Sequence, residues 1–265
     1  MNRIEQLQRF VPALLLELWH ELRRIEFINR SFVMAARLFI AVIPLSIIIS
    51  AVGPDSNSFG DDLVLRFGLE GEGASATREL FATSGTVRGA LGVLGVIVIF
   101  YSLLSFTRGM QAVYLNVWQL RPQGLAEAKQ QTKWALGFIA YLMITSPIRS
   151  VLRENGLTLS YGAISTVIGA GFWVWTPYVL LGKRIAWRRL LPTGIITAVS
   201  VTVFLAACTI YLPRVFSTNA HFYGLIGVAF ALVSWLLAYA LVVIVSLVVG
   251  RVLDRRVGKS DPVLE

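Results

Sequence analysis

Six long apolar stretches alternate with shorter polar segments between residues 31 and 250. The stretches are Phe32–Gly53, Gly89–Thr107, Trp134–Val151, Leu157–Leu181, Leu190–Leu212 and Phe222–Gly250. Each is close to the ~20 residues that an α-helix needs to cross a hydrocarbon core ~30 Å thick. The pattern therefore predicts an all-α, polytopic membrane protein with six transmembrane helices.

An amphipathic helix is predicted before the first stretch, within residues 1–30. Apolar residues recur there at steps of three and four, which places them on one helix face. They are Ile4, Leu7, Val11, Leu14, Leu18, Leu22 and Ile25. We expect Pro12 to interrupt or kink this helix. Two environments remain open for the apolar face: the cytoplasmic membrane interface, or the cytoplasmic ends of the helical bundle.

The segment 54–88, between the first two stretches, is predicted to form a loop on the outer side of the membrane. Its short apolar runs are separated by glycines such as Gly60, Gly68 and Gly71. We therefore expect short helices broken by glycine. The chain then divides into an N-terminal helix (1–30), a six-helix domain (31–250) that includes this loop, and a basic tail (251–265).

The charge distribution predicts the orientation of the chain. Most of the 24 Lys and Arg residues lie before the first stretch, after the sixth, and in the loops between the second and third and the fourth and fifth. The positive-inside rule then places both termini in the cytoplasm, as in a multi-pass protein of a bacterial inner membrane. The net charge of +9 is attributed to this orientation and to contact with anionic headgroups, and not to nucleic acid.

The sequence offers little catalytic chemistry. No Asp or Glu lies inside the six stretches, so the intramembrane carboxylate typical of proton-coupled transport is missing. His20 and His221 are predicted on opposite sides of the membrane, and Cys208 is the only cysteine, so they form no metal or cofactor site. With no phosphate-binding loop and no nucleophile elbow, we expect no enzymatic activity, no metal and no cofactor.

Arg37 is the most informative polar residue, because a guanidinium inside the first stretch keeps its charge. It either extends back to the cytoplasmic headgroups or faces the bundle interior and meets an anion. Tyr101, Ser105 and Arg108 form a polar end to the second stretch on the same side. With Arg37 they are candidates for binding a phosphate-containing headgroup. Asn116 is a further candidate, with a role as an interfacial anchor as the alternative.

Helix-interrupting residues are frequent in the apolar stretches. The hinge candidates are Pro44, Pro147, Pro177, Pro192, Gly224 and Gly227. A backbone carbonyl freed by proline in lipid needs a partner or a water-filled cavity, so broken helices are one way to build a substrate path. Glycines of the second and fourth stretches, Gly171 among them, are expected to permit close helix packing.

Four segments resemble the YihY/BrkB family of inner-membrane proteins, in order along the chain. They are residues 34–44, 108–118 and 189–194, and 223–227 with the later Leu232 and Trp235. The chain departs from the family at Ala36-Arg37, where an aromatic pair is common, and at Ser246-Leu247-Val248, in place of Gly-Ala-Glu. The resemblance therefore implies a divergent member of a family of transport proteins with suggested links to envelope lipids and lipopolysaccharide.

The leading hypothesis is a transporter or translocase, or an accessory to one, for an anionic amphiphile such as an envelope lipid. The alternative is a non-transporting membrane scaffold that organises envelope partners. The expected partners are membrane lipids with anionic headgroups and no nucleic acid, and a homo-oligomer is left open. A cavity that reaches into the membrane favours transport, whereas tightly packed helices favour the scaffold.

Overall fold

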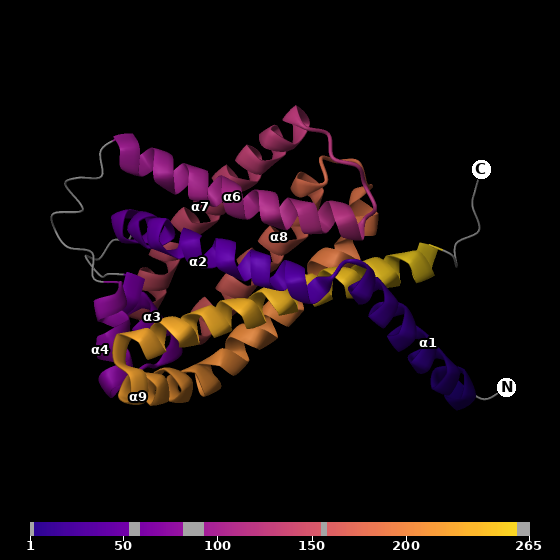
Figure 1. Ribbon diagram of the computed structural model, residues 1–265. Helices are drawn as coiled ribbons and strands as arrows, with labels where there is room; N and C mark the ends of the chain where they lie inside the picture. Colours follow the sequence, from indigo (N-terminus) through magenta and orange to yellow (C-terminus); the bar gives the residue numbers. More distant parts are fainter. Residues whose placement is uncertain (1–2, 53–58, 82–92, 155–157, 259–265) are drawn as a thin grey trace.

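The computed structural model describes the backbone of residues 3–52, 59–81, 93–154 and 158–258. Side chains are described for 14–42, 60–81 without 62 and 66, 100–145, 164, and 166–256. The helices are α1 (Arg3–Arg24), α2 (Phe27–Val52), α3 (Phe59–Phe67), α4 (Gly71–Leu80), α6 (Val93–Val117), α7 (Leu125–Glu154), α8 (Thr158–Leu180) and α9 (Trp187–Gly258). Within these ranges every regular element is a helix (Figure 1).

The predicted all-α fold is confirmed. The described residues of the six apolar stretches all lie in α2, α6, α7, α8 or α9, except Leu181, which follows the end of α8. Among the described residues, one helix is long and apolar enough to cross a membrane, by length and composition alone, over Trp187–Arg256. A shorter apolar helical stretch covers Thr166–Leu180.

Helix α9 is a hairpin of two arms that meet at Gly224. The backbone there has φ 57° and ψ −139°, which is outside the helical region and which residues with a Cβ rarely adopt. Three residues later, a Cβ at Gly227 would lie 2.1 Å from the backbone oxygen of Asn219. The two glycine hinge candidates therefore lie at the bend, which Figure 1 shows beside α4. Each arm is ~50 Å long at 1.5 Å per residue.

The helices continue through the four prolines that were hinge candidates. Pro177 lies inside α8 and Pro192 inside α9, and the turn after Pro177 is closed by a hydrogen bond of 3.0 Å from the Leu181 N–H to the Pro177 carbonyl. The backbones of α2 and α7 include Pro44 and Pro147, whose side chains lie outside the described residues. Helix α1 likewise runs past Pro12. At Pro177 and Pro192 the helix therefore continues on both sides of the proline, which costs one backbone hydrogen bond.

Two glycines outside the second and fourth stretches bring helices into close contact, and a Cβ at Gly169, in the fourth stretch, would lie 3.6 Å from the Tyr141 hydroxyl on α7. A Cβ at Gly250 would lie 2.4 Å from the Cα of Thr193, where the two arms of α9 pack together. A Cβ at Gly194 would lie 2.5 Å from the Cα of Val174, where α9 meets α8. Gly171, by contrast, has no atom within 4 Å of its Cβ position. Its expected packing role is wrong.

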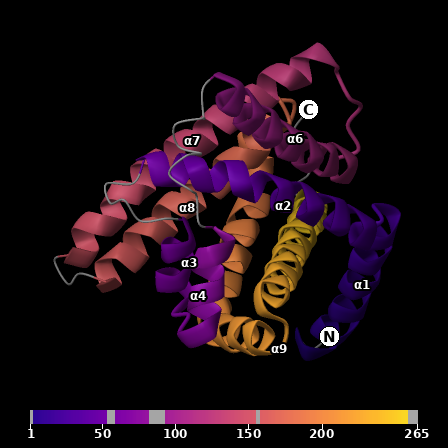
Figure 2. The same ribbon diagram turned by 60° about the vertical axis from the view of Figure 1, so that its left-hand side comes forward.

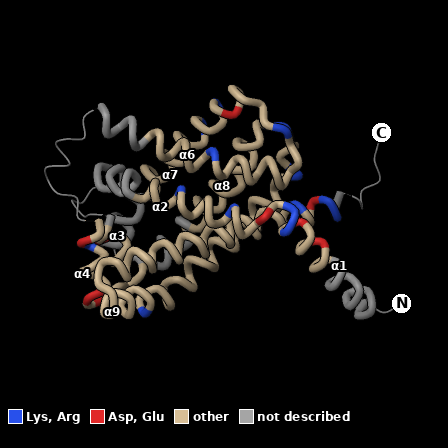
Figure 3. The backbone as a smooth tube through the Cα atoms, viewed as in Figure 1, with Lys and Arg blue, Asp and Glu red and all other residues tan. Residues whose placement is uncertain are grey.

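The two ends of the bundle differ in structure and charge. Helix α1 and the C-terminal end of α9 lie at one end, and α3, α4 and the bend of α9 lie at the other (Figures 1 and 2). Lys and Arg gather at the end that carries α1 (Figure 3), as the loop charges predicted. At the other end, Gly68 (φ 63°) separates α3 from α4, so the prediction of short helices broken by glycine is confirmed.

The helix ends differ from the domain boundaries drawn from the sequence. Helix α1 ends at Arg24, and a short turn that includes Glu26 (φ 53°) leads to α2 at Phe27. At the other end of the chain, α9 continues to Gly258, so the first part of the basic tail is helical. Both differences arise because helix ends depend on side-chain contacts at the basic end of the bundle as well as on hydropathy.

Candidate functional site

Two adjoining cavities lie at the basic end of the bundle, and we call them together the basic groove. The larger has a volume of about 610 Å³ and is lined by α2, by α6, by the segment that leads into α7 and by the first turns of α7. Its polar side chains are Arg30, Arg108, Asn116, Glu127 and Gln131. The smaller has a volume of about 240 Å³ and lies between α2 and α6. Both cavities are lined by Arg30 and by Ala112 of α6.

Arg37 lines the smaller cavity and crosses from α2 to α6. Its Nη1 donates a hydrogen bond of 3.1 Å to the backbone carbonyl of Ser105. The guanidinium lies against Gly109, where a Cβ would be 2.7 Å from Nη1. Only the glycine hydrogen therefore leaves room for Arg37 in this position. The half-buried side chain contacts the neighbouring helix, and no described carboxylate forms an ion pair with it.

Arg30 belongs to both cavities, although the sequence suggested it only as part of the basic N-terminal segment. Its Nε donates a hydrogen bond of 2.6 Å to the carbonyl of Ile25, which fixes the arginine at the turn between α1 and α2. Arg30 and Arg37 are seven positions apart, and residues at this spacing lie on the same face of a helix. That spacing is the signal from which the role of Arg30 was predictable.

Arg108 and Asn116 both lie on α6 and line the larger cavity. Arg108 is exposed, and its Nε donates a hydrogen bond of 3.3 Å to Oε1 of Gln131 on α7. Asn116 lies two turns farther along, and its backbone carbonyl accepts a hydrogen bond of 3.4 Å from Arg24. The structure thus brings Arg37, Arg108 and Asn116 to one site.

The other two candidates contribute less. Ser105 takes part through its backbone carbonyl, which accepts the hydrogen bond from Arg37. Tyr101 lines neither cavity and is 65% exposed. It lies ~10 Å along α6 from Arg108, since seven residues separate them at 1.5 Å per residue.

The charges of the groove favour an anion. Three arginines line the groove, and it contains two carboxylates, those of Glu26 and Glu127. Glu127 accepts a hydrogen bond of 2.7 Å from the backbone N–H of Gln123 at the start of α7. Among the described residues, neither glutamate forms an ion pair with an arginine of the groove. The guanidinium groups therefore keep donors for a bound anion.

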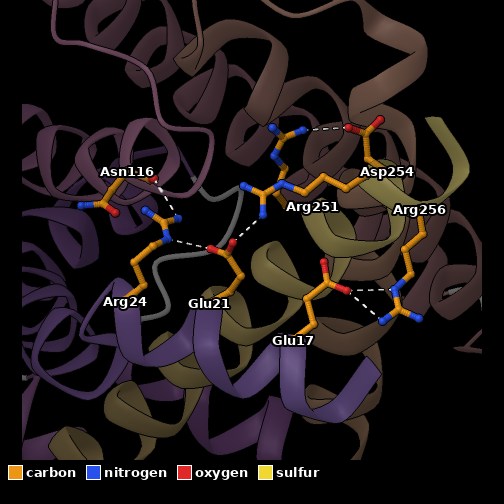
Figure 4. Close-up of polar contacts among 8 residues, drawn as sticks. Glu17, Glu21, Arg24, Asn116, Arg251, Asp254 and Arg256 are labelled. Atoms are coloured by element: carbon orange, nitrogen blue, oxygen red, sulfur yellow. Dashed lines mark hydrogen bonds and ion pairs between the residues drawn. The ribbon is translucent and has the colours of Figure 1, made fainter. Parts of the chain in front are cut away.

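A second group of charged residues beside the groove has its charges paired (Figure 4). Arg256 of α9 contacts Oε2 of Glu17 through Nε at 3.0 Å and Nη2 at 2.8 Å. Glu21 is bound by both Arg24 and Arg255. Burial raises the pKa of Glu21, but the hydrogen bonds and charges of these two arginines outweigh burial, so its pKa lies below the ordinary value. These contacts attach α1 to the end of α9.

Asp254 completes this charged group. It accepts hydrogen bonds from Nη2 of Arg189 at 3.0 Å and from Nη1 of Arg251 at 2.8 Å. The guanidinium of Arg251 also lies over the ring of Trp118, 4.2 Å from its centroid. The acidic side chains at this end therefore neutralise arginines of α1 and α9, whereas the arginines of the basic groove have no such partner among the described residues.

Comparisons with models of known protein families, with curated proteins and with solved structures give no match. The functional interpretation of this site therefore depends on its geometry and on the sequence.

Proposed function

We propose that this chain is a bacterial inner-membrane protein whose six spans are α2, α6, α7, α8 and the two arms of α9, with both termini in the cytoplasm. The shortest of these, α8, has 23 residues, or ~34 Å at 1.5 Å per residue. Large apolar side chains are exposed on the outside of these helices, among them Ile40 (64%), Val167 (71%) and Phe230 (68%). Lipid is the environment that such surfaces fit.

The same proposal combines the two environments left open for α1. Leu18 and Leu22 on one face pack against the core of the bundle. Beside them Leu15, Leu16 and Trp19 are exposed, which suits a helix that contacts the headgroup region of the cytoplasmic leaflet. Helix α1 is then an interfacial helix that is attached to the bundle by its acidic face.

Within this arrangement, the basic groove binds the headgroup of an anionic amphiphile such as an envelope lipid. The observation that carries this proposal is the pair of adjoining cavities lined by Arg30, Arg37 and Arg108 without ion-pair partners among the described residues. Guanidinium groups match the geometry of phosphate and keep their charge when partly buried. The resemblance to the YihY/BrkB family, with its suggested links to envelope lipids, supports the same substrate class.

The protein then moves this amphiphile across the membrane or assists its movement, with the headgroup in the groove and the acyl chains in the bilayer. A non-transporting scaffold makes a different prediction, because it binds the headgroup or a partner without moving lipid. The two functions are separated by measuring binding and movement on the same preparation.

The test uses the purified full-length chain in phosphatidylcholine vesicles that contain a trace of fluorescent phosphatidic acid. The fluorophore is carried on an acyl chain so that the phosphate stays free. Movement of the labelled lipid between the leaflets is measured by its protection from a membrane-impermeant quencher, and binding is measured in parallel. We expect Arg37→Ala and Arg108→Ala each to weaken binding about tenfold or more, because a hydrogen bond to a charged group contributes ~1.5–3 kcal/mol.

Arg188→Ala is the matched control, since Arg188 is exposed at the same end and lines neither cavity. It removes the same charge and is expected to leave binding unchanged. Equal effects of all three substitutions would show that general attraction to the basic end, and not the groove, binds the lipid. Binding without movement supports the scaffold.

A further inference from the structure

We infer that a relay of glutamine side chains, anchored on a backbone carbonyl at the end of α8, fixes the orientation of Arg108 in the basic groove. The relay consists of Gln111 on α6 with Gln130 and Gln131 on α7. This inference rests on the proposed function, because it assigns positioning residues to the same anion site.

The relay begins where α8 ends. The chain leaves the helix through Gly182 (φ 64°), and the N–H groups of Gly182 and Lys183 bond back to Val179 and Tyr178. The carbonyl of Leu180, in the last turn, accepts a hydrogen bond of 2.8 Å from Nε2 of Gln111. Because a carbonyl only accepts, Gln111 must turn its NH₂ group toward Leu180.

The remaining bonds of Gln111 follow from that orientation. The second hydrogen of its Nε2 is donated to Oε1 of Gln130 at 2.7 Å, so both donors of the amide are used. Its Oε1 is then left as the acceptor, and it receives a hydrogen bond of 2.7 Å from Nε2 of Gln131. Gln111 is 1% exposed, so water does not compete for these bonds and an unpaired group here is costly.

Gln131 in turn orients the side chain of Arg108. Since the amide nitrogen of Gln131 is bound to Gln111, its Oε1 faces Nε of Arg108 at 3.3 Å. A flipped amide at Gln111 or Gln131 would set two donors against each other, so the direction of every bond is determined by Leu180. Arg108 is thus held through Nε, and its two terminal nitrogens carry the donors for an anion.

Holding Arg108 in advance reduces the entropy that it loses when an anion binds. An arginine without this support orders its long side chain on binding, which weakens affinity by about three- to tenfold. Gln111 and Gln131 are therefore positioning residues for the groove, although Gln111 lines neither cavity.

The test is a double-mutant cycle on the full-length chain in phosphatidylcholine nanodiscs, with a short-chain phosphatidic acid as the probe. Gln111→Met keeps the length of the side chain and removes its hydrogen bonds. We expect it to lower the affinity for the probe about three- to tenfold in the wild-type background and to have no further effect in the Arg108→Ala background. A merely structural role of Gln111 predicts the same loss in both backgrounds, and that result would overturn the inference.

Thr176→Val is the matched control for stability. The buried Thr176 of α8 accepts a hydrogen bond of 3.1 Å from Nε1 of Trp134 on α7, outside the relay. Its replacement is expected to lower Tm and to leave the probe affinity unchanged. A loss of affinity in this variant as large as that in Gln111→Met would show that damage to this helix packing, and not the relay, weakens binding.

A second variant keeps the inference testable if Gln111→Met does not fold. Gln131→Glu still accepts from Arg108 but brings a negative charge to it and cannot donate to Gln111, so its affinity for the probe should fall to that of Arg108→Ala or below. Wild-type affinity in this variant would overturn the relay alone. If the wild type and Arg108→Ala bind the probe equally, the proposed function fails and the relay fails with it.

Discussion

The contact between the two arms of α9 makes a quantitative prediction for Gly250→Ala. The added Cβ would lie 2.4 Å from Cα and 2.9 Å from Cβ of Thr193. Carbon atoms reach their best separation at about 3.5–4.0 Å, and a Cα cannot rotate away as a side chain does. The arms must therefore separate by roughly 1 Å or more to accept a single methyl group.

The free energy of unfolding lost through that separation can be taken from other proteins, in which a methylene inserted into a packed core costs about 1–3 kcal/mol. For a chain of this size, such a loss lowers Tm by roughly 2–12 °C. The contact lies one turn from the ion pair between Arg189 and Asp254, so the separation should also weaken that pair. The assay is thermal unfolding of the purified chain in one detergent, followed by intrinsic fluorescence.

Gly171→Ala is the matched control, because Gly171 lies inside α8 with open space around its Cβ position. A helical Gly→Ala change without steric conflict is neutral or stabilises the helix by up to ~1 kcal/mol. An equal unfolding temperature for Gly250→Ala and Gly171→Ala would show that the two arms of α9 are not in close contact.

Three further predictions concern the ends of the bundle. The low pKa of Glu21 means that its ion pairs stabilise the docking of α1 above the ordinary value of 4.5, and that this effect is lost as the pH falls through the lowered pKa. The protection of the α1 amides from hydrogen exchange, corrected for the intrinsic rate, should fall in that range, and Arg255→Gln should reduce this pH dependence, since Glu17 still pairs with Arg256. Gly224→Ala should cost about 1–3 kcal/mol through backbone strain alone, which a lower Tm would reveal, whereas an unchanged Tm would contradict the strained turn. A fluorophore on Leu16→Cys, with the native Cys208 buried, should be quenched by lipids that carry a quencher near the headgroup, and quenching only by soluble iodide would place α1 away from the membrane.

The helices were predictable from the sequence because each long apolar run favours a helix through its own residues, independently of distant parts of the chain. The ends of those helices were not, as α1 and α9 show: Glu17 pairs with Arg256, 239 positions away. Close packing was equally hidden, because the importance of Gly250 depends on its neighbour Thr193 across the hairpin. Such partners are set by tertiary structure and leave no local pattern.

The site was predictable in part for the same reason. Arg37 was identified because an arginine inside an apolar stretch keeps its charge and is rare. Arg108 was identified because it belongs to the polar end of the second stretch. Arg30 shares a helix face with Arg37, a signal that was present but was interpreted only as part of the basic end. Gln111 carried no signal as a positioning residue, because its role depends on a carbonyl of α8 that is 69 positions away. Tyr101 lines neither cavity of the groove, and hydropathy does not indicate how far a cavity extends along a helix.

Binding of an anionic headgroup in the basic groove can be observed in a cryo-electron microscopy map. The sample is the full-length chain in nanodiscs of phosphatidylcholine with phosphatidic acid as the minor lipid. We expect density for a phosphate within hydrogen-bond distance of Arg37 and Arg108, and we expect this density to be lost in the double variant with both residues changed to alanine. A groove without lipid density, with phosphatidic acid only around the outside of the bundle, would contradict this binding.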